Sequence, residues 1–291
     1  MEQHNALTTT TVLDSWMTHR SAGASGPTVV FLHGNPTSSH LWRTTLPQVA
    51  REARCLAPDL IGMGDSGKPD SAYRFADHAR YLAAWLDTVV PDGPLVFVGH
   101  DWGGALAQDW ATRHGANRVR GIALVETFLR PVDSAEMTPV ALDFFRAART
   151  PGVGEDMILD QNLFIEGNLR RLVPDITEAD LDIYRATCPD PDSRRPMLQW
   201  AREFPLDGEP ADVTERVTAY GRWMRDSADV PKLLMTVTPE VGLGSTAAIA
   251  WARDNAANLR TEDVGEAGHH APEQVGPRIG AAVARWLKET A

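Results

Sequence analysis

The sequence predicts an α/β fold with a mostly parallel central sheet, helices on both of its faces and an inserted helical cap. Short apolar runs typical of strands alternate with helix-like runs along the first part of the chain. The alternation stops after Arg130, where many prolines and short helical pieces follow, and it resumes at Lys232. We therefore expect residues 1–130 and 213–291 to form the core and residues 131–212 to form the cap.

Each element before the break follows from its local pattern. Strands are expected where aliphatic and β-branched residues form short runs, and helices where apolar residues recur every three or four positions. Tyr81, Leu82, Trp85, Leu86 and Val89 show the helical spacing. In chain order, we expect a strand at 28–32, a helix at 41–51, a strand at 55–60, a helix at 76–90, a strand at 95–98, a helix from about 102 to 114 and a strand at 119–125.

The same two patterns define the elements after the break. Each apolar run is followed by a segment with helical spacing, as expected for parallel strands joined by helices. We expect a strand at 232–238, a helix at 245–255, a strand at 258–264 and a helix at 275–290.

The composition favours a globular protein without a nucleic-acid or membrane partner. The chain has 291 residues, 43% of them hydrophobic, and a net charge of −11, which opposes binding to nucleic acid or an anionic membrane. Cys55 and Cys188 are too few for a disulfide framework, so we interpret both as free thiols. The sequence shows neither a secretory signal nor a run of about 18 apolar residues, so we expect a cytoplasmic protein.

One glycine-rich motif resembles a dinucleotide-binding fingerprint. Residues 62–67 match G-x-G-x-x-G after a strand, and Asp87 lies 20 residues beyond Gly67. The last glycine of such a fingerprint should open a helix, but Lys68 and Pro69 follow it and indicate a loop. We therefore do not expect a nicotinamide or flavin cofactor.

An unusual residue occupies the turn after the strand at 95–98. The sequence Gly99-His100-Asp101-Trp102-Gly103 has the form of a nucleophile elbow, in which a nucleophile lies on a strained turn between a strand and a helix. Serine is usual there, but the carboxylate of Asp101 can displace a leaving group from saturated carbon and form an alkyl ester. A helix-capping role for Asp101 would leave the two flanking glycines unexplained. The motif therefore predicts carbon–halogen cleavage or epoxide opening.

Two loops can stabilise the charges that this chemistry creates. The sequence His33-Gly34-Asn35-Pro36 follows the strand at 28–32, and its backbone N–H at Asn35, with that of Trp102, is expected to form an oxyanion hole. A departing halide also needs N–H donors in an apolar pocket. The Trp102 indole and the Asn35 side-chain amide can supply them.

Hydrolysis of the ester requires a base and an acidic residue that orients it. In this architecture the chain order is nucleophile, acid, histidine. His269 and His270 follow the last expected strand, and either can be the base at this point. Glu126, at the end of the strand at 119–125, and Glu240, after a proline in a later loop, are the candidates for the acid. We favour Glu126 because the loop around Glu240 is expected to be solvated.

The chain resembles the haloalkane dehalogenases of the α/β-hydrolase fold. The resemblance covers most of the chain, and the combination of its motifs is specific, although the His-Asp-Trp-Gly piece also occurs in epoxide hydrolases. It is carried by residues 31–39, 58–67, 98–104, 199–205, 208–213 and 230–234.

The resemblance implies Asp101 as nucleophile, His269 as base, Glu126 as acid, and Asn35 with Trp102 as the halide-binding pair of one branch of the family. It also implies hydrolysis of a small halogenated hydrocarbon with water to a primary alcohol, halide and a proton, without a metal or organic cofactor, in a monomer or homo-oligomer. The residues expected to line the substrate pocket are Phe144, Phe145, Phe164, Pro205, Leu206 and His270.

The chain departs from the family pattern beside the base. The family usually has an aromatic residue directly after the catalytic histidine, followed by any residue and then Gln-Glu, whereas this chain has His270-Ala271-Pro272-Glu273. Keeping Glu273 in register makes His269 the base. A smaller departure is Ala201, where the family more often has proline.

Three other functions remain open from the sequence. An epoxide hydrolase would use lid tyrosines, and Tyr184 and Tyr220 are available for this role. Asn35 argues against this function, because epoxide hydrolases usually have an aromatic residue at the corresponding position. A coelenterazine-type luciferase shares most of the pattern, including the triad. A non-catalytic receptor on the same fold is disfavoured by the complete set of nucleophile, base and acid.

Overall fold

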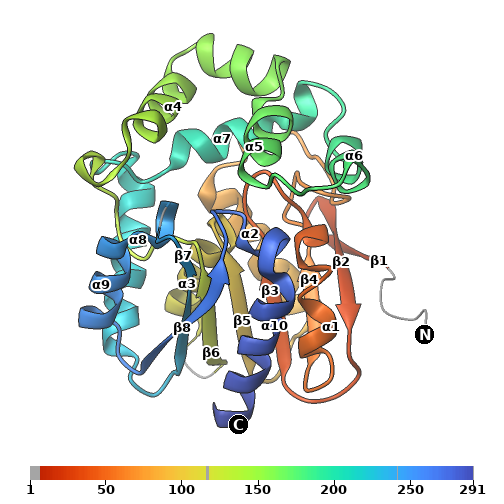
Figure 1. Ribbon diagram of the computed structural model, residues 1–291. Helices are drawn as coiled ribbons and strands as arrows, with labels where there is room; N and C mark the ends of the chain where they lie inside the picture. Colours follow the sequence, from red (N-terminus) through yellow and green to blue (C-terminus); the bar gives the residue numbers. More distant parts are fainter. Residues whose placement is uncertain (1–6, 116–117, 241, 291) are drawn as a thin grey trace.

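The computed structural model describes residues 7–115, 118–240 and 242–290. Within these ranges a single eight-stranded sheet has the order β1-β2-β4-β3-β5-β6-β7-β8 (Figure 1). Strands β1, β2 and β4 pair antiparallel, and all pairs from β4–β3 to β7–β8 are parallel, which confirms the mostly parallel sheet. The strands are β1 (Leu7–Val12), β2 (Ser15–Ala22), β3 (Thr28–Leu32), β4 (Arg54–Pro58), β5 (Leu95–His100), β6 (Val119–Val125), β7 (Lys232–Thr238) and β8 (Leu259–Glu266).

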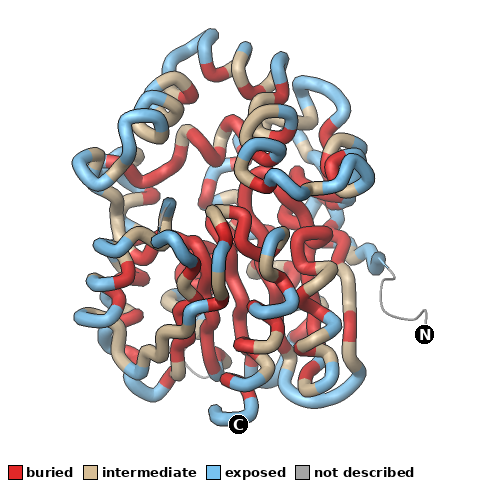
Figure 2. Tube along the Cα trace, viewed as in Figure 1, coloured by how far each residue is buried: buried red, intermediate tan, exposed pale blue. Residues whose placement is uncertain are grey.

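Helices cover both faces of the sheet because both faces are apolar. In β3, Val30 and Leu32 pack into one core, and Val29 and Phe31 pack into the core on the opposite face. Helices α2, α3, α8 and α9 close the first core, and α1 and α10 close the second; Figure 2 shows the buried residues gathered along the sheet. Their bounds are α1 (Leu46–Val49), α2 (Phe75–Val89), α3 (Trp102–His114), α8 (Ala211–Asp226), α9 (Thr246–Asn255) and α10 (Ala271–Thr290).

The chain between β6 and β7 is fully described and adds no strand to the sheet. Its helices lie over one end of the sheet, at the top of Figure 1, and most of them share a separate apolar core that includes Ile158, Leu181 and Leu198. The expected boundary after residue 212 falls in the first turn of α8. The elements before α8 are η2 (Ser134–Glu136), α4 (Pro139–Arg149), η3 (Glu155–Asp160), η4 (Leu163–Leu169), α5 (Arg170–Leu172), α6 (Glu178–Ala186), η5 (Asp192–Arg194) and α7 (Arg195–Glu203).

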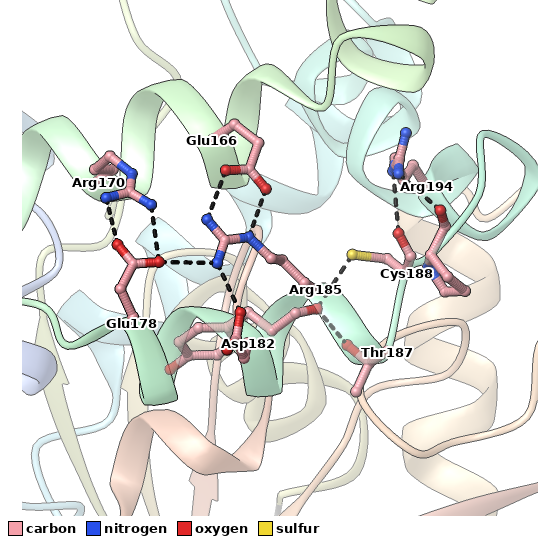
Figure 3. Close-up of polar contacts among 10 residues, drawn as sticks. Glu166, Arg170, Glu178, Asp182, Arg185, Thr187, Cys188 and Arg194 are labelled. Carbon is pink, nitrogen blue, oxygen red and sulfur yellow. Dashed lines mark hydrogen bonds and ion pairs between the residues drawn. The ribbon is translucent and has the colours of Figure 1, made fainter.

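An ion-pair network on the surface joins two of these inserted segments. Arg185 of α6 bonds both oxygens of Glu166 in η4, at 2.7 and 2.8 Å, and also contacts Glu178 and Asp182 (Figure 3). Arg170 forms a second pair with Glu178 at 2.6 Å. Exposed pairs of this kind contribute little individually, so the apolar core beneath them accounts for most of the stability of the insertion.

Most element predictions are confirmed, and two regions differ. The helix expected at 41–51 is wrong: a 3-10 turn, η1 (Ser39–Trp42), and the four-residue α1 replace it. Pro47 lacks an N–H and is tolerated only in the first turn of a helix, so it separates the two pieces. Strands β1 and β2 were not predicted. Threonine favours strands, but the threonines of β1 are mostly exposed, so β1 lacks the apolar alternation by which strands were identified.

No helix within residues 7–115, 118–240 and 242–290 combines the length and apolar character needed to cross a bilayer.

The glycine-rich motif at 62–67 forms a turn around a buried carboxylate. Oδ2 of Asp59 accepts the N–H of Asp65 at 3.0 Å and the hydroxyl of Thr18 at 2.8 Å. The residues after Gly67 are loop, and α2 begins only at Phe75. The loop predicted after Gly67 is therefore confirmed, and the motif forms a turn that the sequence did not predict.

Candidate active site

Asp101 lies on a strained turn between β5 and α3. Its backbone has φ 50° and ψ −127°, a conformation that non-glycine residues rarely adopt, and its side chain makes no capping hydrogen bond. A Cβ at Gly103 would lie 2.1 Å from the carbonyl oxygen of Leu32, and one at Gly99 would lie 2.5 Å from the Cα of Gly104. The two glycines are therefore required by close backbone packing, which is the elbow geometry expected from the sequence.

Two backbone N–H groups bind the carboxylate of Asp101. Asn35 donates its N–H to Oδ2 at 2.9 Å, and the N–H of Trp102 also bonds this carboxylate. Gly34 permits the contact, since a Cβ there would lie 2.4 Å from Oδ2. Burial raises the pKa of Asp101 above its ordinary value, while the charge of His269 and the two N–H groups oppose that shift.

His269 and Glu126 form a hydrogen-bonded pair. Glu126 directly follows β6, and its Oε2 lies 3.3 Å from Nδ1 of His269, in the loop after β8. The carboxylate is 2% exposed and accepts the backbone N–H groups of Leu243 and Gly244 at 3.2 and 3.0 Å. Burial acts to lower the pKa of His269, but the hydrogen bond to Glu126 and the charges of Asp101 and Glu126 outweigh it, so the pKa is raised.

The alternative acid, Glu240, is exposed in the loop after β7. That loop instead supplies the backbone donors that hold Glu126. A Cβ at Gly244 would lie 2.2 Å from Oε1 of Glu126, so only glycine allows the approach. The geometry therefore favours Glu126 as the partner of His269.

His270 and His100 pack around His269. The ring centroid of His270 lies 4.9 Å from that of His269 and 5.9 Å from that of His100. Nε2 of His100 lies 2.7 Å from the carbonyl oxygen of His269 and ties the loop to β5. Burial, reinforced by the charge of His269, lowers the pKa of both His100 and His270 well below the ordinary value, so both are neutral at pH 7.

The two expected halide donors lie on either side of the elbow. The Trp102 ring stacks on Trp200 at 4.4 Å between centroids and meets Phe128 edge-on at 4.8 Å, which fixes the indole plane. The side-chain amide of Asn35 donates one N–H to the carbonyl oxygen of Met197 at 3.2 Å. An amide has two N–H bonds, so this contact orients the group and leaves the other N–H for a ligand.

Aromatic rings connect the expected pocket residue Phe145 to the elbow. Phe145 stacks on Phe204 at 4.3 Å, Phe204 contacts Phe128 at 5.6 Å, and Phe128 contacts Trp102. Residues from α4, from the end of α7 and from the loop after β6 therefore form one apolar wall beside Asp101.

The other expected pocket residues are divided between two regions. Phe144 and Phe164 contact each other at 5.4 Å and pack against the separate core of the insertion. Leu206 is buried in the same core as Trp102, and Pro205 is buried beside it. The structure thus brings Phe145, Leu206 and Pro205 to the elbow side and places Phe144 and Phe164 with the inserted helices.

Several residues near the elbow were not identified from the sequence. Phe128 and Trp200 contact the Trp102 ring, and Phe204 contacts Phe128. His100 bonds the loop of the base. Trp200 and Phe204 lie within residues 199–205, one of the segments that carry the family resemblance, so the sequence could have indicated that these two residues lie near the site. Nothing local in the sequence distinguishes Phe128 from an ordinary core residue.

This fold and site define a class of protein. Residues 27–211 match the family model of the alpha/beta hydrolase fold, so the chain is an α/β hydrolase. It is 45% identical to the haloalkane dehalogenase of Mesorhizobium japonicum, over 96% of this chain and 90% of the relative, and 41% identical to that of Bradyrhizobium diazoefficiens, over 95% and 92%. The chain belongs to the haloalkane dehalogenase family.

Solved structures agree with this assignment. The haloalkane dehalogenase DbeA from Bradyrhizobium elkani superimposes with a TM-score of 0.92 at 41% identity, covering 98% of each chain. DatA from Agrobacterium tumefaciens superimposes with a TM-score of 0.93 at 33% identity, covering 99% of this chain and 98% of that one.

Proposed function

We propose that this enzyme hydrolyses haloalkanes to a primary alcohol, halide and a proton through a covalent ester on Asp101. The observation that carries the proposal is the placement of the Asp101 carboxylate, which is held by two backbone N–H groups and faces a His269–Glu126 pair. A carboxylate nucleophile suits attack on saturated carbon, and no step needs a metal or an organic cofactor.

In the first step Asp101 attacks the carbon that bears the halogen. Oδ2 accepts the N–H of Asn35, so we assign the new C–O bond to Oδ1. The C–X bond breaks, and the halide leaves with its electron pair toward the indole N–H of Trp102 and the free amide N–H of Asn35. Hydrogen bonds to a charged acceptor stabilise it in an otherwise apolar site.

In the second step water cleaves the ester. Nε2 of His269 takes a proton as water attacks the carboxyl carbon of Asp101, and Glu126 stabilises the imidazolium through Nδ1. The tetrahedral oxyanion forms at Oδ2, which accepts the N–H of Asn35, and the N–H of Trp102, which also bonds this carboxylate, adds a second donor. Collapse breaks the bond between the carboxyl carbon and Oδ1, and the alkoxide takes the proton from His269 and leaves as the alcohol. The proton of the resulting carboxylic acid passes to solvent, which restores the carboxylate of Asp101.

We also propose that the enzyme belongs to the branch of the family with Asn and Trp halide donors and a glutamate acid. This assignment is supported by Glu126 bonding His269 while Glu240 remains exposed. We further propose that residues 131–212 act as a cap over the substrate pocket, and that Phe145, Pro205, Leu206 and His270 line it. A cytoplasmic location is supported by the two buried free thiols, Cys55 and Cys188.

Epoxide hydrolysis is less compatible with the tyrosines. The hydroxyl of Tyr184 donates to Glu273, and that of Tyr220 donates to the carbonyl oxygen of Phe128 at 3.0 Å. Both hydroxyl protons are therefore donated to other protein groups, whereas epoxide opening requires a free acidic hydroxyl beside the nucleophile.

The test is halide release from brominated and iodinated short alkanes. Asp101→Ala should abolish release, and His269→Phe should give one halide per enzyme and then accumulate the ester, visible as an added alkyl mass on the intact protein. Asp87→Ala, at a surface carboxylate, is the control that should keep wild-type rates. Full turnover by Asp101→Ala would contradict the mechanism, and light emission with coelenterazine would support the luciferase alternative.

A further inference from the structure

Three imidazoles lie together beside the elbow, and the proposed mechanism uses only one of them. One ring nitrogen from each of His100, His269 and His270 lies within 4.8 Å of the other two. The rings come from β5 and from the loop after β8, so the sheet brings them together. Three converging neutral imidazoles are a donor set typical of sites for zinc, copper or nickel.

The hydrogen bonds of two rings leave a lone pair on the opposite nitrogen. Nε2 of His100 lies 2.7 Å from the carbonyl oxygen of His269, and a carbonyl only accepts, so this nitrogen carries the proton of the neutral ring. Nδ1 of His269 faces the carboxylate of Glu126 and likewise carries its proton. Metal-bound histidines are usually held in this way, by a carbonyl or carboxylate on the other ring nitrogen.

Two buried nitrogens in the cluster lack protein partners. Nδ1 of His100 and Nδ1 of His270 are both inaccessible, and neither has a hydrogen-bond partner among the residues that the structure describes. Buried polar atoms are nearly always paired, so an unpaired atom in a native structure calls for a ligand or another role. His100 in particular presents a lone pair on a ring whose other nitrogen is already fixed.

We propose that His100, His269 and His270 bind a divalent transition-metal cation such as Zn²⁺. Zinc–nitrogen bonds of about 2.0–2.1 Å place tetrahedral ligands about 3.4 Å apart. The three nitrogens lie within 4.8 Å of one another, so metal binding requires a small inward rotation of the rings. The carboxylates of Glu126 and Asp101, which interact with His269, offset the positive charge of the metal. If the proposed function holds, the bound cation also removes the lone pair of the base and inhibits ester hydrolysis.

The third imidazole of the site comes from a position at which this chain departs from its family. In the family the residue after the base is usually aromatic, and an aromatic ring at position 270 would leave only two imidazoles. His270→Phe is therefore the informative variant, and His114→Phe, at an exposed histidine, is the matched control.

Binding is measured first, without reference to activity. Zn²⁺ is titrated by calorimetry into the full-length protein, prepared without a histidine tag. We expect one equivalent to bind wild type and His114→Phe and none to bind His270→Phe, with thermal unfolding confirming that the variant is folded. Failure of wild type to bind, or unchanged binding by His270→Phe, overturns the proposal.

A second readout does not depend on any variant. In protein labelled with ¹⁵N-histidine, Zn²⁺ should shift the ring resonances of three of the nine histidines. Shifts confined to other histidines overturn the site. Zn²⁺ at ten times its Kd should also lower halide release about tenfold, and a chelator should restore it. Absence of halide release from the untreated enzyme would instead contradict the proposed function and leave the binding result to decide the site.

Discussion

Oε2 of Glu126 lies 3.3 Å from Nδ1 of His269, although the two residues are 143 positions apart in the chain. The contact forms because β6 and β8 are parallel members of one sheet, so the residues that follow their carboxyl ends meet at the same edge. Two backbone N–H groups from the loop after β7, which lies between them, fix the carboxylate. Three consecutive strands of the sheet thus build the acid–base pair.

Glu126→Gln should lower kcat by about 10²- to 10⁴-fold, the usual range for losing acid–base assistance. Glutamine keeps the shape of the side chain but cannot stabilise the imidazolium of His269. Glu240→Gln is the matched control, because its carboxylate is exposed in the loop after β7, and it should keep wild-type kcat. Steady-state halide release measures both variants, and a larger loss in Glu240→Gln would reverse the assignment of the acid.

The pH profile of kcat should report the raised pKa of His269, because this base acts in hydrolysis of the bound ester and not in its formation. The base must be neutral, and the hydrogen bond to Glu126 stabilises its charged form, so kcat should fall with decreasing pH through a midpoint above the ordinary histidine value of 6.5. Glu126→Gln removes the main interaction that raises this pKa and should move the midpoint to lower pH. A midpoint that stays in place in Glu126→Gln would show that another group controls the profile.

The sequence alone located the parts of this protein that depend on local pattern. The strands β3, β6 and β7 and the helix α3 have the predicted bounds, because each has an uninterrupted apolar run or a clear start and stop. The glycines on both sides of Asp101 identified the elbow, because this motif is also a local pattern.

The remaining features depend on contacts between distant segments. The edge-on contact of Phe128 with Trp102 and the unpaired nitrogen of His270 arise only when separate elements pack together. The residues expected to line the pocket also lie in two different regions. Phe145 lies near the elbow and Phe144 packs against the core of the insertion, although the two residues are adjacent in the chain. Neighbouring positions on a helix point to different sides, and the sequence does not say which side faces the elbow.

Trp102→Phe should weaken halide binding about 10- to 100-fold. Phenylalanine keeps an aromatic ring between Trp200 and Phe128 but lacks the indole N–H, and a hydrogen bond to a charged group is worth about 1.5–3 kcal/mol. Trp200→Phe is the matched control, since its indole N–H is buried without a partner among the described residues. Product inhibition by bromide gives both constants, and equal weakening in the two variants would point to lost packing instead.

Acid should destabilise the folded protein through His78, which stacks on Trp200 at 4.0 Å. Burial lowers the pKa of His78 from 6.5 to about 3, so below pH 6.5 the unfolded chain binds a proton that the folded chain does not. Stability is therefore lost as the pH falls from 6.5 toward 3, and at pH 5 this residue alone accounts for about 2 kcal/mol. Urea unfolding at pH 7 and pH 5 measures the difference. It should shrink by about that amount in His78→Phe, whereas Trp286→Phe, at a buried tryptophan in the core on the other face of the sheet, removes no titratable group and should retain the wild-type difference. An unchanged difference in His78→Phe would mean that other buried groups, such as His33, carry the acid sensitivity.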